Sequence, residues 1–174
     1  ASDVYKRQVI TSGKGGVGKT TTTANIGAGL SKLGKKVVII DTDLGLRNLD
    51  VVMGMENLVV YNLVDVVEGS CRLKQALIRD SRYENLYLLL SAQTKDKSAV
   101  SPEQMRKLVD EIREDYDYIL IDCMPSLGML TINALAAADS VIVPVQAHYL
   151  PLKGMTQLMK TIGKVQRQLN PNLK

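Results

Sequence analysis

Eight residues near the start of the chain constrain its fold more than any other segment. Residues 13–20 read Gly-Lys-Gly-Gly-Val-Gly-Lys-Thr and match the pattern G-x-x-x-x-G-K-[ST]. The apolar pair at residues 9–10 precedes them, and a helical pattern over residues 20–33, closed by Gly34, follows. Glycines allow a tight turn with backbone N–H groups pointing inward, and the N-terminus of the next helix adds partial positive charge. We therefore expect a strand, a phosphate-binding loop and a helix in that order.

Apolar runs spaced along the chain predict the rest of the sheet. The runs read as strands buried on both faces, which is the pattern of a parallel sheet. They cover residues 37–40, 86–90, 118–121 and 141–143, with residues 9–10 as a shortened fifth. Helical segments between them imply right-handed βαβ connections. The predicted fold class is α/β, a three-layer P-loop NTPase fold with a mostly parallel central sheet flanked by helices.

Bulk composition fits one globular domain and excludes little else. With 174 residues the chain is long enough for one domain with a core. Aromatic residues make up only 4%, with no Phe and no Trp, so the core must be aliphatic. The net charge of +4 permits an anionic partner, but the basic residues are scattered, which favours a solvated surface. No stretch approaches the roughly 20 apolar residues of a membrane span.

Two helical segments have readable patterns. Ser101, Pro102 and Gln104 form an N-terminal capping signature, and the apolar positions that follow share one face. The last segment, residues 152–169, places Met155, Leu158, Met159, Ile162 and Val165 on one side and Lys160, Lys164 and Arg167 on another. A helix at a membrane surface has this pattern too, but a helix covering the sheet is favoured. Residues 42–61 fit neither period and are long for a βα connection, so we expect a functional loop there.

Side chains that follow the strands and the loop are candidates for nucleotide chemistry. Lys19 is placed to contact the β- and γ-phosphates, and the Thr20 hydroxyl to bind Mg²⁺. Asp41, Asp43 and Asp122 follow strands, at the sheet edge where open α/β sheets bind ligands. An Asp after a strand is often a turn former, but three beside a P-loop favour function. The residues expected around the phosphates are Gly13, Lys14, Gly15, Gly16, Val17, Gly18, Lys19, Thr20 and Thr21.

Other reactive side chains carry weaker predictions. Lys14 is not required by the general P-loop pattern, so it either stabilises charge during phosphoryl transfer or is a solvated lysine. His148 is the only histidine and is predicted to be structural. Ser126 lacks a histidine partner and is expected to cap a helix. Cys123 is predicted to be a small core residue, and with Cys71 it fits a reduced, cytosolic compartment.

Residues 14–20 carry the deviant Walker A signature, so the chain resembles the ParA/MinD family of ATPases. Residues 9–121 resemble its septum-site (MinD) branch, whereas residues 122–174 are similar to its DNA-partitioning (ParA/Soj) branch. The strings behind the first resemblance lie at residues 11–14, 43–50, 84–87 and 92–97. Residues 122–128 read Asp-Cys-Met-Pro-Ser-Leu-Gly, where the septum-site branch would carry Asp-Ser-Pro-Ala-Gly-Ile-Glu. The chain is then an intermediate member of the family or a product of two joined genes.

The resemblance implies a role for each matching residue. Lys14 matches the signature lysine that reaches the partner's nucleotide in an ATP-sandwich dimer, and Lys19 the phosphate lysine. Asp43 matches the switch I aspartate that positions the hydrolytic water, and Asp122 the Walker B-type acid that acts on Mg²⁺ through water. The expected catalytic residues are thus Lys14, Lys19 and Asp43, and the expected magnesium-site residues are Thr20, Asp43 and Asp122.

The resemblance also implies how such a protein works. Its cofactors would be ATP and Mg²⁺, and ATP would drive formation of a homodimer. A partner protein of the MinE/MinC or ParB kind would stimulate slow hydrolysis, in placement of the division septum or in DNA partitioning. The intact protein would be cytoplasmic, with peripheral membrane or nucleoid association. The alternative is a nucleotide-binding fragment without useful turnover. An iron–sulfur relative of this P-loop class is disfavoured, because Cys71 and Cys123 are not in the expected contexts.

Both ends of the sequence carry expectations as well. Residues 1–8 are polar and lack an initiator Met, so we expect a non-native or disordered start. Residues 9–174 are expected to form a single P-loop ATPase domain that is truncated at its C-terminus, because family members continue with another strand and an adenine-contacting segment.

Overall fold

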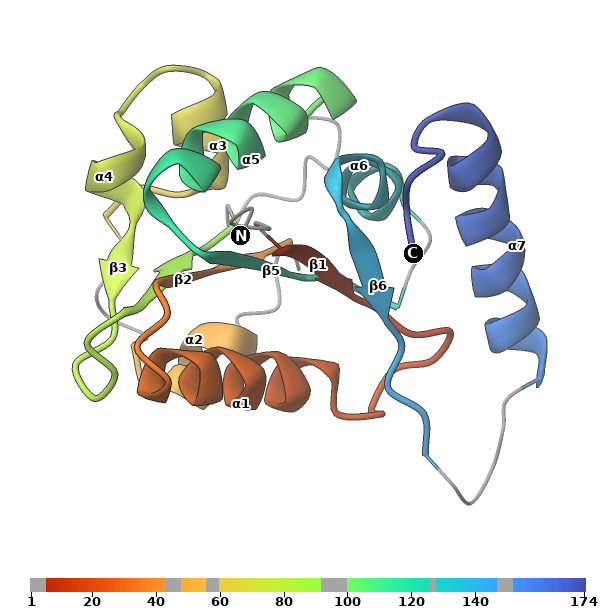
Figure 1. Ribbon diagram of the computed structural model, residues 1–174, viewed down its shortest axis with the longest axis horizontal. Helices are drawn as coiled ribbons and strands as arrows, with labels where there is room; N and C mark the ends of the chain where they lie inside the picture. The colour runs from red at the N-terminus through yellow and green to blue at the C-terminus, as the bar shows by residue number, and fades with distance from the viewer. Residues whose placement is uncertain (1–5, 43–47, 56–59, 92–99, 126–127, 147–151) are drawn as a thin grey trace.

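The computed structural model describes residues 6–42, 48–55, 60–91, 100–125, 128–146 and 152–174. Six strands form one sheet in the order β3-β4-β2-β5-β1-β6, in which β3 runs antiparallel to β4 and the other pairs are parallel (Figure 1). The strands are β1 (Lys6–Ile10), β2 (Val37–Asp41), β3 (Ile78–Arg79), β4 (Leu86–Leu89), β5 (Tyr118–Asp122) and β6 (Ser140–Ile142). The fold is the predicted three-layer α/β P-loop fold.

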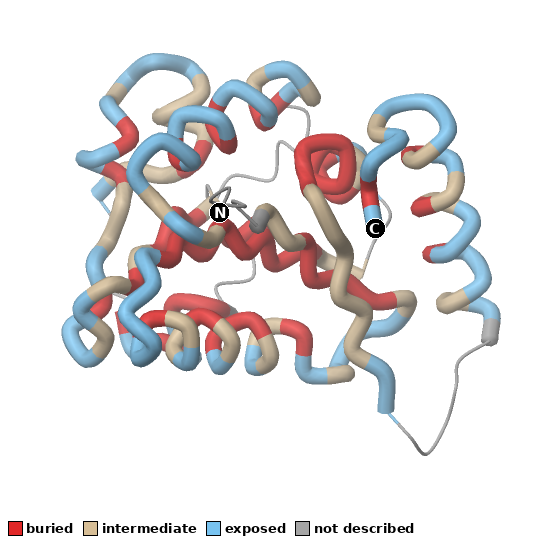
Figure 2. The backbone as a smooth tube through the Cα atoms, in the orientation of Figure 1, coloured by how far each residue is buried: buried red, intermediate tan, exposed pale blue. Residues whose placement is uncertain are grey.

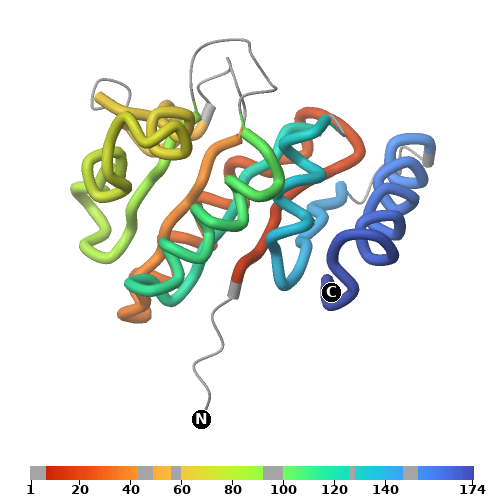
Figure 3. Tube along the Cα trace, turned by 90° about the horizontal axis from the view of Figure 1, so that it is seen from above, coloured from red at the N-terminus to blue at the C-terminus, as the bar shows by residue number. Residues whose placement is uncertain are grey.

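Helices cover both faces of this sheet. In Figure 1, α1 and α2 lie below the sheet, α3 to α6 lie above it, and α7 stands at the β6 edge. Figure 3 shows α7 at the opposite end of the molecule from β3 and α4. The helices are α1 (Lys19–Lys32), α2 (Asn48–Met53), α3 (Leu63–Val67), α4 (Leu73–Ala76), α5 (Pro102–Asp115), α6 (Met129–Ala137) and α7 (Leu152–Gln168). None of the helices in these described ranges is long and apolar enough to cross a membrane.

The core is aliphatic and divided by the sheet into two halves. Along β2, Val38 and Ile40 face the half of the core between the sheet and helices α5 and α6. Val37 and Ile39 face the other half, between the sheet and α1. Successive side chains of a strand point to opposite faces, so a continuous apolar run fills both halves. Figure 2 shows the buried residues concentrated along the strands and on the helix surfaces turned toward them.

Strand β1 starts earlier than predicted. It begins at Lys6, not at Val9, and its first residues pair with β5 in the middle of the sheet. The polar side chain of Arg7 is accommodated by Asp139, whose carboxylate accepts hydrogen bonds from the Arg7 backbone N (2.8 Å), Nε (3.0 Å) and Nη2 (2.6 Å). The prediction failed because it required apolar side chains, whereas a central strand needs backbone hydrogen bonds and compensated charge.

The sheet edges also differ from the prediction. All three residues of β6 are only half-buried, although the run was predicted to be buried on both faces. This strand is at an edge of the sheet. On its outer side, Val141 N donates to Lys174 O (2.9 Å), and Lys174 N donates to the carbonyl of Asp139, the residue before the strand (3.0 Å). The two-residue strand β3 and the short helices α2, α3 and α4 were not predicted, because they are too short to show a period.

The patterned helices agree with prediction in most respects. Helix α5 begins with the predicted capping box: Ser101 Oγ accepts from Gln104 N and Gln104 Oε1 from Ser101 N. Its buried residues are Met105, Leu108, Val109 and Ile112, as predicted. In α7, however, Met159 is 56% exposed instead of buried. The buried stripe runs through Leu158, Ile162 and Val165, and Met159 lies about 100° around the helix from Leu158.

Candidate functional site

Three neighbouring strands end at the same level and form the floor of the site. In the sheet register, Asp122 of β5 lies beside Ile10 of β1 on one side and Asp41 of β2 on the other. The backbone continues this alignment past the strands, since Cys123 N donates to Ile10 O (3.0 Å). Thr42 ties β2 to β5 through its backbone N (3.0 Å) and its hydroxyl (2.8 Å), both donating to Asp122 O. The carboxyl ends of β1, β2 and β5 are thus held together by these bonds.

The glycine-rich loop crosses above these strand ends and leads into α1. Gly16 and Gly18 have φ values of 76° and 85°, a region that other residues rarely adopt, so these positions need glycine. Gly18 is also the N-cap of α1, and its carbonyl accepts from Thr22 N at 2.8 Å. Thr23 Oγ1 donates to Lys19 O at 2.9 Å in the first turn. The predicted strand, loop and helix are present in the predicted order.

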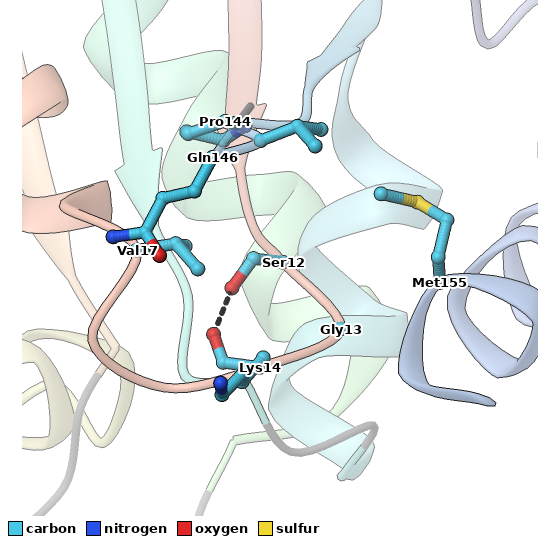
Figure 4. A pocket seen from close by; sticks show the side chains of 8 residues that line it. Ser12, Gly13, Lys14, Val17, Pro144, Gln146 and Met155 are labelled. Carbon is cyan, nitrogen blue, oxygen red and sulfur yellow. Dashed lines mark hydrogen bonds between the residues drawn. The ribbon is translucent and has the colours of Figure 1, made fainter. Parts of the chain in front are cut away.

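Side chains on both sides of the loop hold its backbone. The Ser12 hydroxyl donates to the carbonyl oxygen of Lys14, as the dashed line in Figure 4 shows. From the segment after β6, Gln146 Nε2 donates to Gly16 O at 3.4 Å. The sequence analysis did not predict this contact of Gln146 with the loop. Nothing in its position along the sequence indicates this contact, because it depends on β6 lying next to β1.

A cavity of about 580 Å³ lies between the loop, the start of α1 and the end of β5. Its size falls in the range of small-molecule sites. Lys19 and Asp122, both more than 90% buried, line it together with Thr20 and Thr21 from the first turn of α1. The lining residues are Gly15, Gly16, Gly18, Lys19, Thr20, Thr21, Val51, Val52, Asp122, Cys123 and Pro125.

The cavity brings together most of the predicted phosphate-site residues but not all. Gly13, Lys14 and Val17 line a second, smaller cavity between the loop, the segment after β6 and the start of α7 (Figure 4). The Lys14 side chain is exposed, whereas Lys19 is buried. Asp41 is buried at the end of β2 and does not line either cavity. Asp43, predicted to be catalytic and metal-binding, lies outside the described residues, as do Ser126 and His148.

Two valines from α2 form part of the cavity wall. Val51 and Val52 are 56% and 46% exposed, although they are adjacent apolar residues beside a site with charged groups. They belong to the 42–61 segment, for which we expected a function without naming these residues. The sequence signal that could have pointed to them is a pair of adjacent valines in a stretch without clear periodicity.

Cys123 lines the cavity but is chemically inert. It is 1% exposed, and burial raises the pKa of its thiol to about 12, despite a hydrogen bond with Thr42 that lowers it. Because the thiolate is the nucleophilic form, the thiol is unreactive near neutral pH. Its prediction as a small core residue is confirmed by its burial in the core.

The oxygen donors at the cavity fit a hard divalent cation. The Thr20 hydroxyl and the Asp122 carboxylate both line it, and oxygen ligands of this kind suit Mg²⁺. Within the described ranges, no group of three or more His, Cys, Asp or Glu side chains gathers as a metal cluster. Magnesium in nucleotide sites is held by one or two protein oxygens together with phosphates and water, so the donor set is sufficient.

Similarity to known proteins points to the same kind of nucleotide site. A family model described as an AAA domain matches residues 6–174. The chain belongs to the MinD/ParA family of ATPases. It is 57% identical over 136 residues to the septum site-determining protein MinD of Bacillus subtilis (strain 168), covering 78% of this chain and 51% of that protein.

Two solved structures are similar to this chain along almost its whole length. Cobyrinic acid a,c-diamide synthase of Mycobacterium smegmatis, with bound ADP and magnesium, superposes with a TM-score of 0.82 at 33% identity, over 96% of this chain and 71% of that one. The MinC:MinD cell division complex of Aquifex aeolicus gives 0.77 at 40% identity, over 96% and 66%. The chain spans about half the length of the curated MinD relatives it matches.

Proposed function

We propose that this chain binds ATP with Mg²⁺ in the 580 Å³ cavity, hydrolyses it, and acts as a nucleotide-dependent switch. Residues 6–174, which include the whole of β1, would form the single ATPase domain that does this. The observation that carries the proposal is the shared cavity of the glycine-rich loop, Lys19, Thr20 and Asp122 at the carboxyl ends of three adjacent strands. Relatives with bound ADP and magnesium support it.

Each residue has a distinct part in the proposal. The buried Lys19 ammonium pairs with the β- and γ-phosphates. The attraction between these charges is strongest where water is excluded. The first turn of α1 adds backbone N–H groups and the positive end of its dipole. Thr20 and Asp122 hold Mg²⁺, directly or through water, and the ion neutralises phosphate charge when bound. Asp43 is proposed to position the attacking water.

Association with a second copy is the second part of the proposal. Lys14 is exposed at the loop, so its ammonium is free to reach a nucleotide held by a facing copy. Val51 and Val52 add exposed apolar surface at the cavity rim, which a facing copy would cover. A lysine supplied in this way would stabilise charge that develops during phosphoryl transfer.

Placement of the division septum is the cellular role we propose, in preference to DNA partitioning. The MinD relatives at 46–57% identity are septum site-determining proteins, and one MinD has been solved with MinC. By analogy, a MinC- or MinE-like protein would be the partner that reads or resets the switch. A second candidate is nucleotide binding without turnover, because the loop, Lys19, Thr20 and Asp122 can hold a nucleotide whether or not it is hydrolysed.

Calorimetric titration with MgATP and a phosphate-release assay on this chain test both candidates. We expect saturable binding and slow turnover in the wild-type chain. Lys19→Ala should weaken binding by at least about 10-fold, as expected for lost charged hydrogen bonds. Lys35→Ala removes an exposed lysine after α1 and should leave both values unchanged. Binding without phosphate release would favour the second candidate, and absence of binding would contradict both.

A further inference from the structure

The first residue of the glycine-rich loop touches the first turn of α7, backbone against backbone. A Cβ atom added at Gly13 would overlap the Gly154 carbonyl group and lie 2.7 Å from Met155 N. A Cβ atom added at Gly154 would overlap Gly13 O and lie 2.9 Å from the Gly13 carbonyl carbon. Figure 4 shows Gly13 facing the helix that carries Met155. The two segments are 141 positions apart in the sequence, yet neither leaves room for a side chain on the other.

Space, not backbone conformation, explains these two glycines. Neither is among the residues with positive φ, so another amino acid could adopt their backbone angles. In a helix, glycine costs about 1 kcal/mol relative to alanine. Gly163 makes a useful comparison, because its added Cβ would meet only the flexible end of Arg167, at 3.5 Å. Gly154 alone of these two helix glycines is required by a neighbouring backbone.

Helix α7 is anchored away from this contact, so its first turn can act as a fixed support. Leu158, Ile162 and Val165 are at most 5% exposed in the core. Just beyond the helix, Asn170 Nδ2 donates to Ala138 O at 2.7 Å and to Leu135 O at 3.0 Å. The first turn therefore continues a helix that is fixed to the packed core from Leu158 onward.

We propose that Gly154 is a positioning residue for the phosphate loop. The first turn of α7 supports Gly13 and so fixes the path of the next residues, whose N–H groups must point toward the phosphates. This inference rests on the proposed nucleotide function. Coupling between two sites is reciprocal in free energy, so a nucleotide that orders the loop also restrains the start of α7. Nucleotide occupancy then reaches a surface of the molecule outside the cavity.

The matched pair Gly154→Ala and Gly163→Ala separates positioning from helix stability. Both changes raise helix propensity in α7, but only the first forces the loop away. Titration with MgADP well below the unfolding temperature should show a Kd raised at least about 10-fold for Gly154→Ala, equal to about 1.4 kcal/mol. For Gly163→Ala the Kd should stay within about two-fold of wild type, because the added methyl group makes no clash there. Equal Kd values for both variants would overturn the proposal.

Hydrogen exchange keeps the test valid if Gly154→Ala does not fold or if nucleotide does not bind. In the wild-type chain, MgADP should slow exchange of the amides at residues 153–157 by a larger factor than at residues 165–168, where only the general stabilisation by bound ligand acts. Without nucleotide, the amides at residues 14–18 should exchange faster in a folded Gly154→Ala than in Gly163→Ala. A wild-type chain that binds no MgADP contradicts the proposed function, whereas binding without the larger slowing at residues 153–157 contradicts the coupling alone.

Discussion

At the scale of single residues, Lys14 and Lys19 occupy different environments within one loop. Lys19 is buried at the start of α1 and faces the large cavity, whereas Lys14 is exposed and lines the smaller one. A buried ammonium can hold phosphates within its own chain. An exposed ammonium is available to a second molecule, and this difference separates the two lysines experimentally.

Lys14→Ala is expected to leave MgATP binding within a few-fold of wild type and to abolish ATP-dependent dimerisation. Turnover should fall at least about 100-fold, because charges supplied in trans contribute 10³–10⁵ in related phosphoryl transfers. Sedimentation with a non-hydrolysable ATP analogue and phosphate release measure the two effects. Lys35→Ala is the control for loss of one exposed lysine. Dimerisation and turnover at wild-type levels would reduce Lys14 to a surface charge.

The two cysteines should react very differently with an alkylating reagent at pH 8. Burial raises the pKa of Cys123 to about 12, so its thiolate is scarce, and access is also blocked. Cys71 is half-buried, and burial, followed by the charge of Asp65, also raises the pKa of its thiol. Mass spectrometry should find alkylation at Cys71 well before Cys123 in the folded chain, and at both in denaturant. Equal rates in the folded chain would contradict the burial of Cys123.

The pKa of Cys123 also gives the sign of a pH effect on stability. The folded value is above the ordinary 9.0, so the folded state binds more protons between pH 9 and about pH 12. Its contribution to the free energy of unfolding is therefore fully present below pH 9 and is lost as the pH rises through about 12.

The phosphate loop was predictable residue by residue, because its function fixes the residue types and their spacing. The contact between Gly13 and Gly154 was not, since it joins segments far apart in the chain. Val51, Val52 and Gln146 reach the site for the same reason: packing of α2 and β6 places them there. No local pattern records such placement.

At the scale of secondary-structure elements, ion pairs of Arg7 hold the polar start of β1, and the one with Asp139 is the shorter. Asp139 accepts three hydrogen bonds from Arg7, whose guanidinium also lies 3.7 Å from the more exposed Asp110. Asp139→Ala should lower the free energy of unfolding by about 1–3 kcal/mol, because charged donors lose their acceptor. Urea unfolding followed by circular dichroism measures this change.

Asp110→Ala removes the other carboxylate near Arg7 and serves as the matched control. It should cost less than about 1 kcal/mol, since the Asp110 side chain is 62% exposed and such pairs are weak. Equal losses of unfolding free energy for the two substitutions would contradict the Arg7–Asp139 hydrogen bonds as the main support of β1.

Elements with a strong period were predictable and short ones were not. Helix α5 has both a capping box and a buried stripe, and its start and buried residues agree with the sequence pattern. Strand β1 was shortened in the prediction because Lys6, Arg7 and Gln8 are polar. Its place between β5 and β6 is set by backbone pairing, which side-chain hydropathy does not report.

At the scale of the whole molecule, the layered fold was predictable because alternating apolar runs and helices allow few topologies. The order of strands places β1 between β5 and β6, and this order brings the loop, Asp122 and the start of α7 to one end of the sheet. Nucleotide binding at this end should therefore stabilise the sheet and α7 together and not the loop alone.

A single cooperative rise in the unfolding temperature with MgADP is the consequence. At a ligand concentration of 100 times Kd, binding contributes about 2.7 kcal/mol. For a chain of this size, that corresponds to a rise of about 5–10 °C. Scanning calorimetry is the suitable measurement, because the chain contains no Trp for fluorescence.

Two controls decide whether the rise comes from the proposed site. Excess EDTA should reduce it, since Thr20 and Asp122 are proposed to hold magnesium together with the phosphates. Lys19→Ala should reduce it further, while Lys35→Ala should leave it unchanged. The same rise in Lys19→Ala as in wild type would place the nucleotide elsewhere. Two separate unfolding transitions in the presence of MgADP would show that α7 and the sheet do not unfold as one unit. The contact between Gly13 and Gly154 would then be too weak to transmit nucleotide binding to α7.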